Sequence, residues 1–284
     1  MKVSQLYIYP VKSLRGIAVE KAELTPLGLR YDRHWMIIDD NNQFVTQRKH
    51  PNMVLVKTRL SDNFLHLSKE GMPELQIPLA PASSNKHTIS ATIWRDECQV
   101  VDEGDEFGRW ITQALQSKKT LRLVRMAPNE QRPQSQGERF GHENTTQFSD
   151  AVSYLVCHQS SLNTLNDALV DKGFEPSTVE QFRPNIVLEN TDNEFNAFQE
   201  HQVRSFKHQN YTLESRDPCQ RCIMPTIDIQ TGEKHPKQEP YKTLVTLNPM
   251  PDNPKAPAFG QNATLTPESN GEHITIGDNI SVIF

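Results

Sequence analysis

Short runs of β-forming residues, separated by turn residues, fill roughly the first hundred positions of this 284-residue chain. The first run ends at Pro10, which has no N–H to donate to a sheet. Two runs at 33–39 and 44–47 flank an Asp-Asn-Asn turn at 40–42, a pattern typical of a hairpin. Further short runs lie at 54–60, 64–67, 91–94 and 99–101. Short strands at this spacing predict a barrel or sandwich.

Two amphipathic segments predict helices that pack on these strands. At 107–115 apolar residues recur every three or four positions, and Asp105 is in place as the N-cap. A second helix is expected from Ser160. Its apolar side comprises Leu162, Leu165, Leu169 and Val170. Further strands are expected at 121–126, 152–157, 186–188 and 280–284. The predicted fold class is therefore mainly β with some α (α+β).

A polar segment at 127–147 interrupts this pattern. It contains Pro128, Pro133 and Gly137, among other residues, and predicts a long loop or lid. From 244 to 284 turn residues alternate with short apolar runs, so the end of the chain is again expected to be β-structure.

The net charge, the cysteine count and the lengths of the apolar runs limit the partners and the cellular location expected for this protein. The net charge of −5 gives no reason to expect a nucleic-acid partner. Four cysteines, of which Cys98 and Cys157 are isolated, are too few for a disulfide framework and indicate a reducing compartment. The first apolar run is too short for a signal peptide, and no later segment approaches a membrane span. We therefore expect a cytoplasmic protein without a membrane partner.

The other two cysteines form the motif Cys219-Gln220-Arg221-Cys222, which is followed by β-branched residues that predict a strand. Three interpretations are open. Cationic neighbours could activate a dithiol redox pair, although Pro225 argues against the helix expected after such a pair. A zinc site would need a second ligand pair at metal spacing, and none follows. The third interpretation is a single soft thiolate ligand for a metal that a cofactor brings.

Basic residues recur where predicted strands begin or end. Lys12 follows the first strand, Arg30 and Arg33 precede the strand at 33–39, and Arg183 precedes the strand at 186–188. The segment 216–222 carries two more arginines. One such charge is usually a solvated strand end, but four groups together predict a pocket that holds an anion.

Four motifs, taken in order, resemble one known family. They are Tyr9-Pro10-Val11-Lys12-Ser13, Asp32-Arg33-His34-Trp35, Phe182-Arg183-Pro184-Asn185-Ile186-Val187 and Cys219-Gln220-Arg221-Cys222-Ile223. Together they resemble the MOSC proteins with a MOSC N-terminal β-barrel domain, a group that includes the mitochondrial amidoxime-reducing component and bacterial YcbX-like relatives. The resemblance implies an N-terminal barrel-like domain at 1–104, a MOSC barrel domain at 105–284, and a cofactor cleft between them.

The resemblance also implies the cofactor and its residues. The cofactor is the molybdenum cofactor (molybdopterin), and Cys222 is the protein ligand of the metal, with Arg221 favouring its thiolate. Residues that match family positions around the pterin and its phosphate are Lys12, Ser13, Arg33, Ser149, Asp150, Ser161, Arg183 and Asn185. Thr226 and Asp228 follow the ligand and are expected to line the site. Asp228 is also a candidate catalytic residue, as a proton donor.

The activity implied is two-electron reduction of N-hydroxylated compounds such as amidoximes, hydroxylamines and hydroxylated base analogues. No cysteine follows Cys222, so no C-terminal iron–sulfur cluster is expected. Electrons would then come from a separate donor protein of the ferredoxin, flavoprotein or cytochrome b5 type. The alternative is a non-catalytic protein that binds or carries the cofactor or its sulfur.

Overall fold

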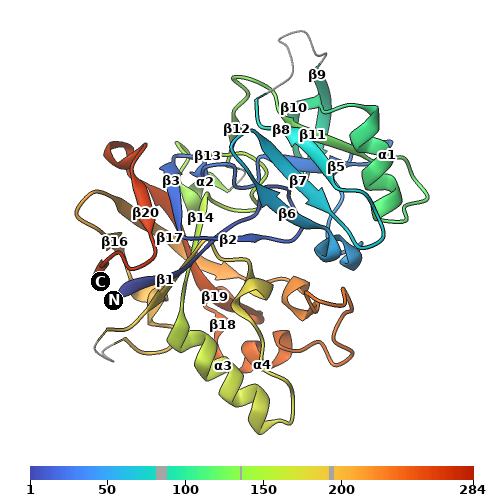
Figure 1. The fold of residues 1–284 in the computed structure, drawn as a ribbon. Coiled ribbons are helices and arrows are strands. Elements are labelled where there is room, and N and C mark those ends of the chain that lie inside the picture. The colour runs from blue at the N-terminus through green and yellow to red at the C-terminus, as the bar shows by residue number, and fades with distance from the viewer. Residues whose placement is uncertain (81–87, 135, 192–194) are drawn as a thin grey trace.

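The computed structural model describes residues 1–80, 88–134, 136–191 and 195–284. The chain forms two lobes, one above the other in Figure 1, and the two termini lie side by side on the lower lobe. The terminal amino group of Met1 donates to the carbonyl oxygen of Ile280 at 3.2 Å, and Lys2 forms a β-bridge with Asn279. The mainly β architecture with a few packed helices confirms the expected fold class.

The upper lobe contains a four-stranded antiparallel sheet in the order β5-β11-β10-β9. Its strands are β5 (Trp35–Ile38), β9 (Thr88–Ile93), β10 (Asp96–Asp102) and β11 (Arg122–Met126). A second sheet runs β6 (Lys57–Leu60), β7 (Phe64–Ser68) and β8 (Leu75–Pro78), after the 3-10 helix η1 (Pro51–Leu55). Helix α1 (Asp105–Ala114) packs on β11, and its apolar stripe is buried with Trp35, as the periodicity predicts.

The lower lobe is built on a nine-stranded sheet in the order β2-β1-β15-β14-β19-β17-β16-β21, with β18 paired to β19. The first strands are β1 (Lys2–Ile8), β2 (Ile17–Val19), β14 (Tyr154–His158) and β15 (Ile186–Glu189). The others are β16 (Ser205–Lys207), β17 (Thr212–Gln220), β18 (Pro249–Met250), β19 (Asn253–Leu265) and β21 (Ser281–Ile283). Strands β14 and β15 are parallel, and α3 (Gln159–Asp171) and the 3-10 helix η2 (Val179–Phe182) lie in the connection between them.

Smaller elements complete the structure. The three-stranded sheet β20-β3-β4 joins β20 (His273–Thr275), β3 (Lys21–Thr25) and β4 (Gly28–Leu29). Helix α4 (Tyr241–Leu247) contacts β19 and α3. The remaining 3-10 helices are η3 (Gln199–Gln202), η4 (Met224–Thr226) and η5 (Pro267–Ser269). Within the described ranges, no helix has both the length and the apolar character needed to cross a bilayer.

Strand pairing crosses the predicted domain boundary at residue 104. Strand β1 lies inside the large lower sheet, beside β15, whereas β11 completes the upper sheet between β5 and β10. The N-terminal strand therefore belongs structurally with the C-terminal half, and the boundary itself stays a prediction.

Several local predictions differ from the structure. Asp105 is the first helical residue of α1, and Gly104 occupies the N-cap position. Val170 of α3 is 56% exposed, because the buried face of the helix is formed by Leu162, Leu165 and Leu169. The β-branched residues after Cys222 do not form a strand: Pro225 lacks an N–H, and the segment forms η4 instead.

The remaining differences concern loops. The described part of 127–147 contains β12 (Arg132–Pro133), β13 (Thr145–Thr146) and α2 (Gly137–Phe140); residue 135 lies outside the described residues. Within the segment 244–284, where turns and short strands were expected to alternate, residues 253–257 belong to the long strand β19, and residues 241–247, which overlap its start, form α4. The strand expected at 54–60 is divided between the end of η1 and β6.

Candidate functional site

The first two motifs run side by side where β1 ends. Proline at position 10 terminates β1, and the following residues lie along the start of β5. The backbone N–H of Arg33 donates to the carbonyl of Tyr9 at 2.8 Å, and that of Lys12 donates to the carbonyl of Trp35 at 2.8 Å. Two segments separated by about twenty residues of sequence are thereby held as one backbone platform.

Two arginines enclose the ring of Tyr9 on this platform. The guanidinium carbon of Arg33 lies 4.4 Å from the ring centroid and that of Arg183 lies 4.2 Å from it. Arg33 also donates to the carbonyl of Arg183 at 3.2 Å, and Arg183 donates to the carbonyl of Leu14 at 2.7 Å. Burial, and then the positive charge of Arg33, lower the pKa of Arg183 to about 10. The ring lets two like charges lie close together, since each guanidinium is attracted to the aromatic ring.

Buried polar side chains fix these arginines. The side chain of Asp32 is fully buried; it accepts a 2.8 Å hydrogen bond from the N–H of Tyr9 and forms an ion pair with Arg33. The amide oxygen of Asn185 accepts from Arg33 at 3.3 Å and from the N–H of Leu155 at 3.2 Å. We call Tyr9, Asp32, Arg33, Arg183 and Asn185 the Tyr9 cluster.

Three of the predicted site residues adopt left-handed backbone conformations. The φ angles are 69° at Ser13, 48° at Arg33 and 57° at Arg183. Side chains other than glycine rarely occupy this region, and such conformations concentrate where function constrains the backbone. The chain therefore holds these residues in place at an energetic cost.

A second cluster surrounds the sulfur of Cys222, two residues beyond the end of β17. The Nε of Arg48 donates to this sulfur at 3.4 Å, and Nη2 of the same arginine pairs with Asp150 at 3.1 Å. The other carboxylate oxygen of Asp150 pairs with Lys12 and accepts from the indole N–H of Trp94 at 3.0 Å. We call Cys222, Arg48, Asp150, Lys12 and Trp94 the Cys222 cluster.

Charge in the Cys222 cluster is set by Lys12 and Asp150. Burial lowers the pKa of Lys12 to about 8, although Asp150 acts in the opposite direction. Partial desolvation would raise the pKa of the half-exposed Asp150 carboxyl, but the charges of Lys12 and Arg48 hold it well below its usual range. The ammonium of Lys12 also donates to the carbonyl of Phe148 at 2.7 Å. The carboxylate is therefore anionic throughout the physiological pH range.

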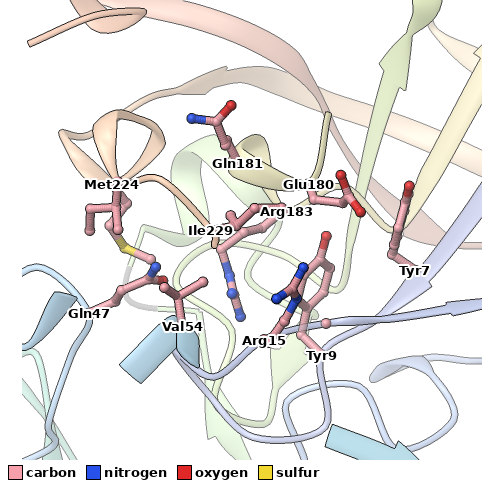
Figure 2. A pocket seen from close by; sticks show the side chains of 12 residues that line it. Tyr7, Tyr9, Arg15, Gln47, Val54, Glu180, Gln181, Arg183, Met224 and Ile229 are labelled. Atoms are coloured by element: carbon pink, nitrogen blue, oxygen red, sulfur yellow. The ribbon is translucent and has the colours of Figure 1, made fainter. Parts of the chain in front are cut away.

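A small cavity of about 30 Å³ borders the Tyr9 cluster (Figure 2). Tyr9 and Arg183 lie at its centre, with Gln47 and Met224 on one side. The hydroxyl of Tyr9 and the amide oxygen of Gln47 are buried without a hydrogen-bond partner among the described residues. Gly16 admits the ring of Tyr9, because a Cβ at that position would lie 2.4 Å from it. The unpaired hydroxyl of Tyr9 and the guanidinium of Arg183 suit a group that accepts hydrogen bonds, whereas the unpaired oxygen of Gln47 suits an N–H donor.

Some predicted residues are engaged elsewhere. The carboxylate of Asp228 accepts hydrogen bonds from the N–H groups of Gln230 and Thr231, at 2.7 and 2.8 Å, and so closes its own turn. The hydroxyl of Ser161 donates to Glu200 at 2.8 Å and accepts from the N–H of Phe198. These side chains support local structure, and we do not carry them into the proposed site.

Three further predicted residues contribute through other contacts. Arg221 donates to the sulfur of Cys219 at 2.9 Å and to the carbonyl of Phe182 at 2.6 Å, so it is Arg48 that contacts Cys222. The hydroxyl of Thr226 donates to the carbonyl of Ile223 within η4. Ser149 contributes its carbonyl, which accepts from Arg132 at 2.9 Å. These contacts hold the backbone around the site.

Five residues of the two clusters and the cavity were not predicted individually from the sequence: Arg48, Trp94, Gln47, Tyr9 and Asp32. A signal existed for Arg48: the run Gln47-Arg48-Lys49-His50 follows the hairpin and is another basic segment at the end of a β-type run. Among the described residues, no group of three or more His, Cys, Asp or Glu could hold a metal ion.

Two protein-family models match this chain and identify its class. A model described as the MOSC N-terminal beta barrel domain matches residues 1–118, and the MOSC domain model matches residues 143–281. The protein is thus a two-part MOSC protein in which the Cys222 cluster draws residues from both matched regions.

Individual relatives place the chain within one family. Mitochondrial amidoxime-reducing component 1 of Xenopus laevis is 31% identical over 271 residues, covering 91% of this chain and 76% of that protein. The protein of the same name from Homo sapiens is 30% identical over 292 residues, covering 99% and 82%. The chain belongs to the family of the amidoxime-reducing components, as its motifs indicate. Molybdenum cofactor sulfurase of Drosophila persimilis is also 30% identical, over 98% of this chain but only 35% of that larger protein.

The expected cytoplasmic location is wrong by this comparison. Several of the relatives, from Xenopus laevis, Danio rerio, Mus musculus and Homo sapiens, are named mitochondrial proteins. Four free cysteines cannot distinguish two reducing compartments, because both permit the same free thiols.

Proposed function

We propose that this protein is a molybdenum-cofactor-dependent reductase of N-hydroxylated compounds, with Cys222 as the metal ligand. The observation that carries the proposal is the position of the Cys222 sulfur. It lies against Arg48 in a network that includes Lys12 and Asp150, and the Tyr9 cluster presents two more arginines. Relatives named amidoxime-reducing components support the choice of substrate class.

The residues fit the cofactor in their chemistry. A thiolate is the soft ligand that suits a sulfur-rich metal centre, and the guanidinium of Arg48 lies against the Cys222 sulfur. Arginine forks are suited to a phosphate, and the unpaired hydroxyl of Tyr9 and amide of Gln47 offer hydrogen bonds to a polar ring system. In this proposal Arg33, Arg183, Ser13 and Asn185 hold or orient the pterin and its phosphate.

The overall reaction balances as a two-electron reduction. An amidoxime takes up two electrons and two protons, its N–O bond breaks, and the products are an amidine and water. When bound, the molybdenum cofactor supplies a two-electron couple at a metal with an open coordination position. This chain's residues hold the metal through Cys222, neutralise anionic groups through their arginines, and keep Asp150 anionic at the mouth of the site. A separate donor protein of the ferredoxin, flavoprotein or cytochrome b5 type supplies the electrons.

The test combines metal analysis with turnover. The cofactor-loaded protein is assayed against benzamidoxime with a reduced dye as electron source, and molybdenum per chain is measured by mass spectrometry. We expect turnover in the wild type and at least tenfold less bound molybdenum in Cys222→Ala, with an unchanged circular dichroism spectrum. Cys219→Ala is the matched control and keeps its metal. Equal molybdenum in Cys222→Ala and the wild type would contradict the assignment of the ligand.

A carrier function is the second candidate, and the similarity to molybdenum cofactor sulfurases favours it. A carrier binds the cofactor tightly and releases it to an apo-enzyme. Loaded protein that reconstitutes a cofactor-free molybdenum enzyme, and that does not reduce any amidoxime, would replace the reductase proposal with this one.

A further inference from the structure

An exposed tryptophan stands at the edge of the Cys222 cluster. Trp94 lies in the turn between β9 and β10, and 44% of its surface is accessible to solvent, whereas the chain's other two tryptophans, Trp35 and Trp110, are buried. It occupies a left-handed conformation, with φ of 58°, which a bulky residue adopts at a cost. A large apolar side chain held in such a conformation at the surface indicates a role outside the core.

Three contacts hold the Trp94 ring in a defined orientation. Its indole N–H donates to Asp150 at 3.0 Å, and the guanidinium carbon of Arg48 lies 4.5 Å from its ring centroid. The ring of Phe44 lies 4.9 Å away, tilted by 57°. The indole is therefore a fixed aromatic surface rather than a freely rotating side chain.

Arg48 connects this surface directly to the proposed metal ligand. One guanidinium contacts the indole, the Asp150 carboxylate and the sulfur of Cys222. Exposure increases outward along this path: a quarter of the Arg48 side chain is accessible, but nearly half of Trp94 is. A molecule that approaches the sulfur from this side meets Trp94 and the carboxylate first.

We propose that Trp94 is a specificity-determining residue of the substrate site, which selects N-hydroxylated groups carried on flat aromatic or heteroaromatic skeletons. The inference rests on the proposed reductase function and adds a substrate class to it. The open part of the indole stacks with the flat skeleton. The Asp150 carboxylate, 44% exposed and anionic, accepts from the amino group of an amidoxime. The two contacts direct the hydroxylated nitrogen inward, toward Cys222.

The kinetic test compares two substrates that differ in the skeleton only. Trp94→Ala and Trp94→Phe are measured with benzamidoxime and acetamidoxime, with a reduced dye as donor and rates expressed per bound molybdenum. We expect kcat/KM for benzamidoxime to fall about tenfold in Trp94→Ala and less in Trp94→Phe, which keeps a ring. The value for acetamidoxime should change less than about twofold, since a methyl group offers little to stack. Phe64→Ala, a change at another partly exposed aromatic on β7, is the matched control and should alter neither value.

A binding measurement provides a readout independent of turnover. Since Trp94 is the exposed tryptophan of three, acrylamide quenching of the protein's fluorescence reports mainly on it. Benzamidine, the product amidine, should protect the wild type from quenching, whereas acetamidine should not. Trp94→Phe has no exposed tryptophan and should show neither the quenching nor the protection.

The outcomes separate the two proposals. If the loaded protein reduces neither amidoxime, the reductase proposal fails, while protection by benzamidine still tests the aromatic subsite. If both amidoximes are reduced and Trp94→Ala lowers both equally or neither, the subsite inference alone is overturned. A loss that occurs with a protein electron donor but not with the dye also overturns it and assigns Trp94 to a docking surface.

Discussion

The two clusters of the site are built in different ways. The Tyr9 cluster is buried, and its charged groups bind to backbone atoms: Arg183 to the carbonyl of Leu14, Arg33 to the carbonyl of Arg183, and Asp32 to the N–H of Tyr9. The Cys222 cluster is partly exposed, and its links run mainly between side chains. Backbone anchoring makes the first cluster part of the folded framework, whereas the second can change its side chains without changing the fold.

This difference assigns separate roles to the two clusters. A framework of fixed cations suits a cofactor that stays bound, since little rearrangement is needed when the ligand arrives. A partly solvated network of side chains suits the face where substrates enter and leave. Matched substitutions at the carboxylates of the two clusters measure the difference.

The largest loss of unfolding free energy is expected from a substitution of Asp32. Asp32→Ala leaves the Arg33 charge and the N–H of Tyr9 without their buried partner. Breaking a buried ion pair in this way costs about 3–5 kcal/mol of unfolding free energy. Urea denaturation monitored by circular dichroism measures the loss. A cost below about 1 kcal/mol would show that the Tyr9 cluster is not part of the framework.

An intermediate effect on the unfolding free energy is expected from the titration of Lys12. The pKa of Lys12 is lowered from 10.5 to about 8 by burial, so between these values the unfolded chain binds a proton that the folded protein lacks. Stability from this residue is therefore gained as pH rises through the window and is lost as pH falls. The gain amounts to about 2 kcal/mol between pH 7 and about pH 9.5. In urea denaturation across the same pH range, Lys12→Met should lack this pH-dependent gain in unfolding free energy. Identical pH profiles for the wild type and Lys12→Met would contradict the prediction.

The smallest loss of unfolding free energy is expected from a substitution of Asp150, which is the carboxylate of the Cys222 cluster as Asp32 is that of the Tyr9 cluster. Its side chain is 44% exposed, so water replaces much of what Asp150→Asn removes, and the expected loss of unfolding free energy is about 1 kcal/mol. Removing the negative charge should also move the Lys12 component to lower pH, because Asp150 raises the pKa of that lysine. Denaturation of Asp150→Asn at several pH values checks both points. A loss as large as that for Asp32→Ala would remove the distinction between the clusters.

Much of the local structure could be predicted from the sequence. Proline after the first strand, turn residues in the hairpin and the α1 periodicity act over a few residues, so they are visible in a single sequence. Of the basic strand ends, Arg33 and Arg183 lie in the Tyr9 cluster and Lys12 lies in the Cys222 cluster, while their role in binding an anion stays a prediction. Pairing of β1 with β15 and of β3 with β20 joins residues about 180 and 250 positions apart, and no local pattern encodes it.

The individual roles were harder to predict, because one side-chain type serves several purposes. The oxygens of Asp228 and Ser161 are as well suited to hydrogen bonds within the protein as to a ligand, and the structure uses both within the protein. The sequence predicts Arg221 as the partner of Cys222, and only the folded chain brings Arg48 to the sulfur. Spacing identifies the residue types of a site, and geometry assigns their roles.

The amide side chain of Asn185 connects the site to the large sheet. It receives Arg33 and the N–H of Leu155 on one side and donates to the carbonyl of Tyr7 on the other, so it bridges β1, β14 and the site. A ligand that draws Arg33 toward itself leaves this oxygen to the Leu155 amide alone. Occupancy of the site should therefore be visible inside the protein, as slower hydrogen–deuterium exchange of the Leu155 amide.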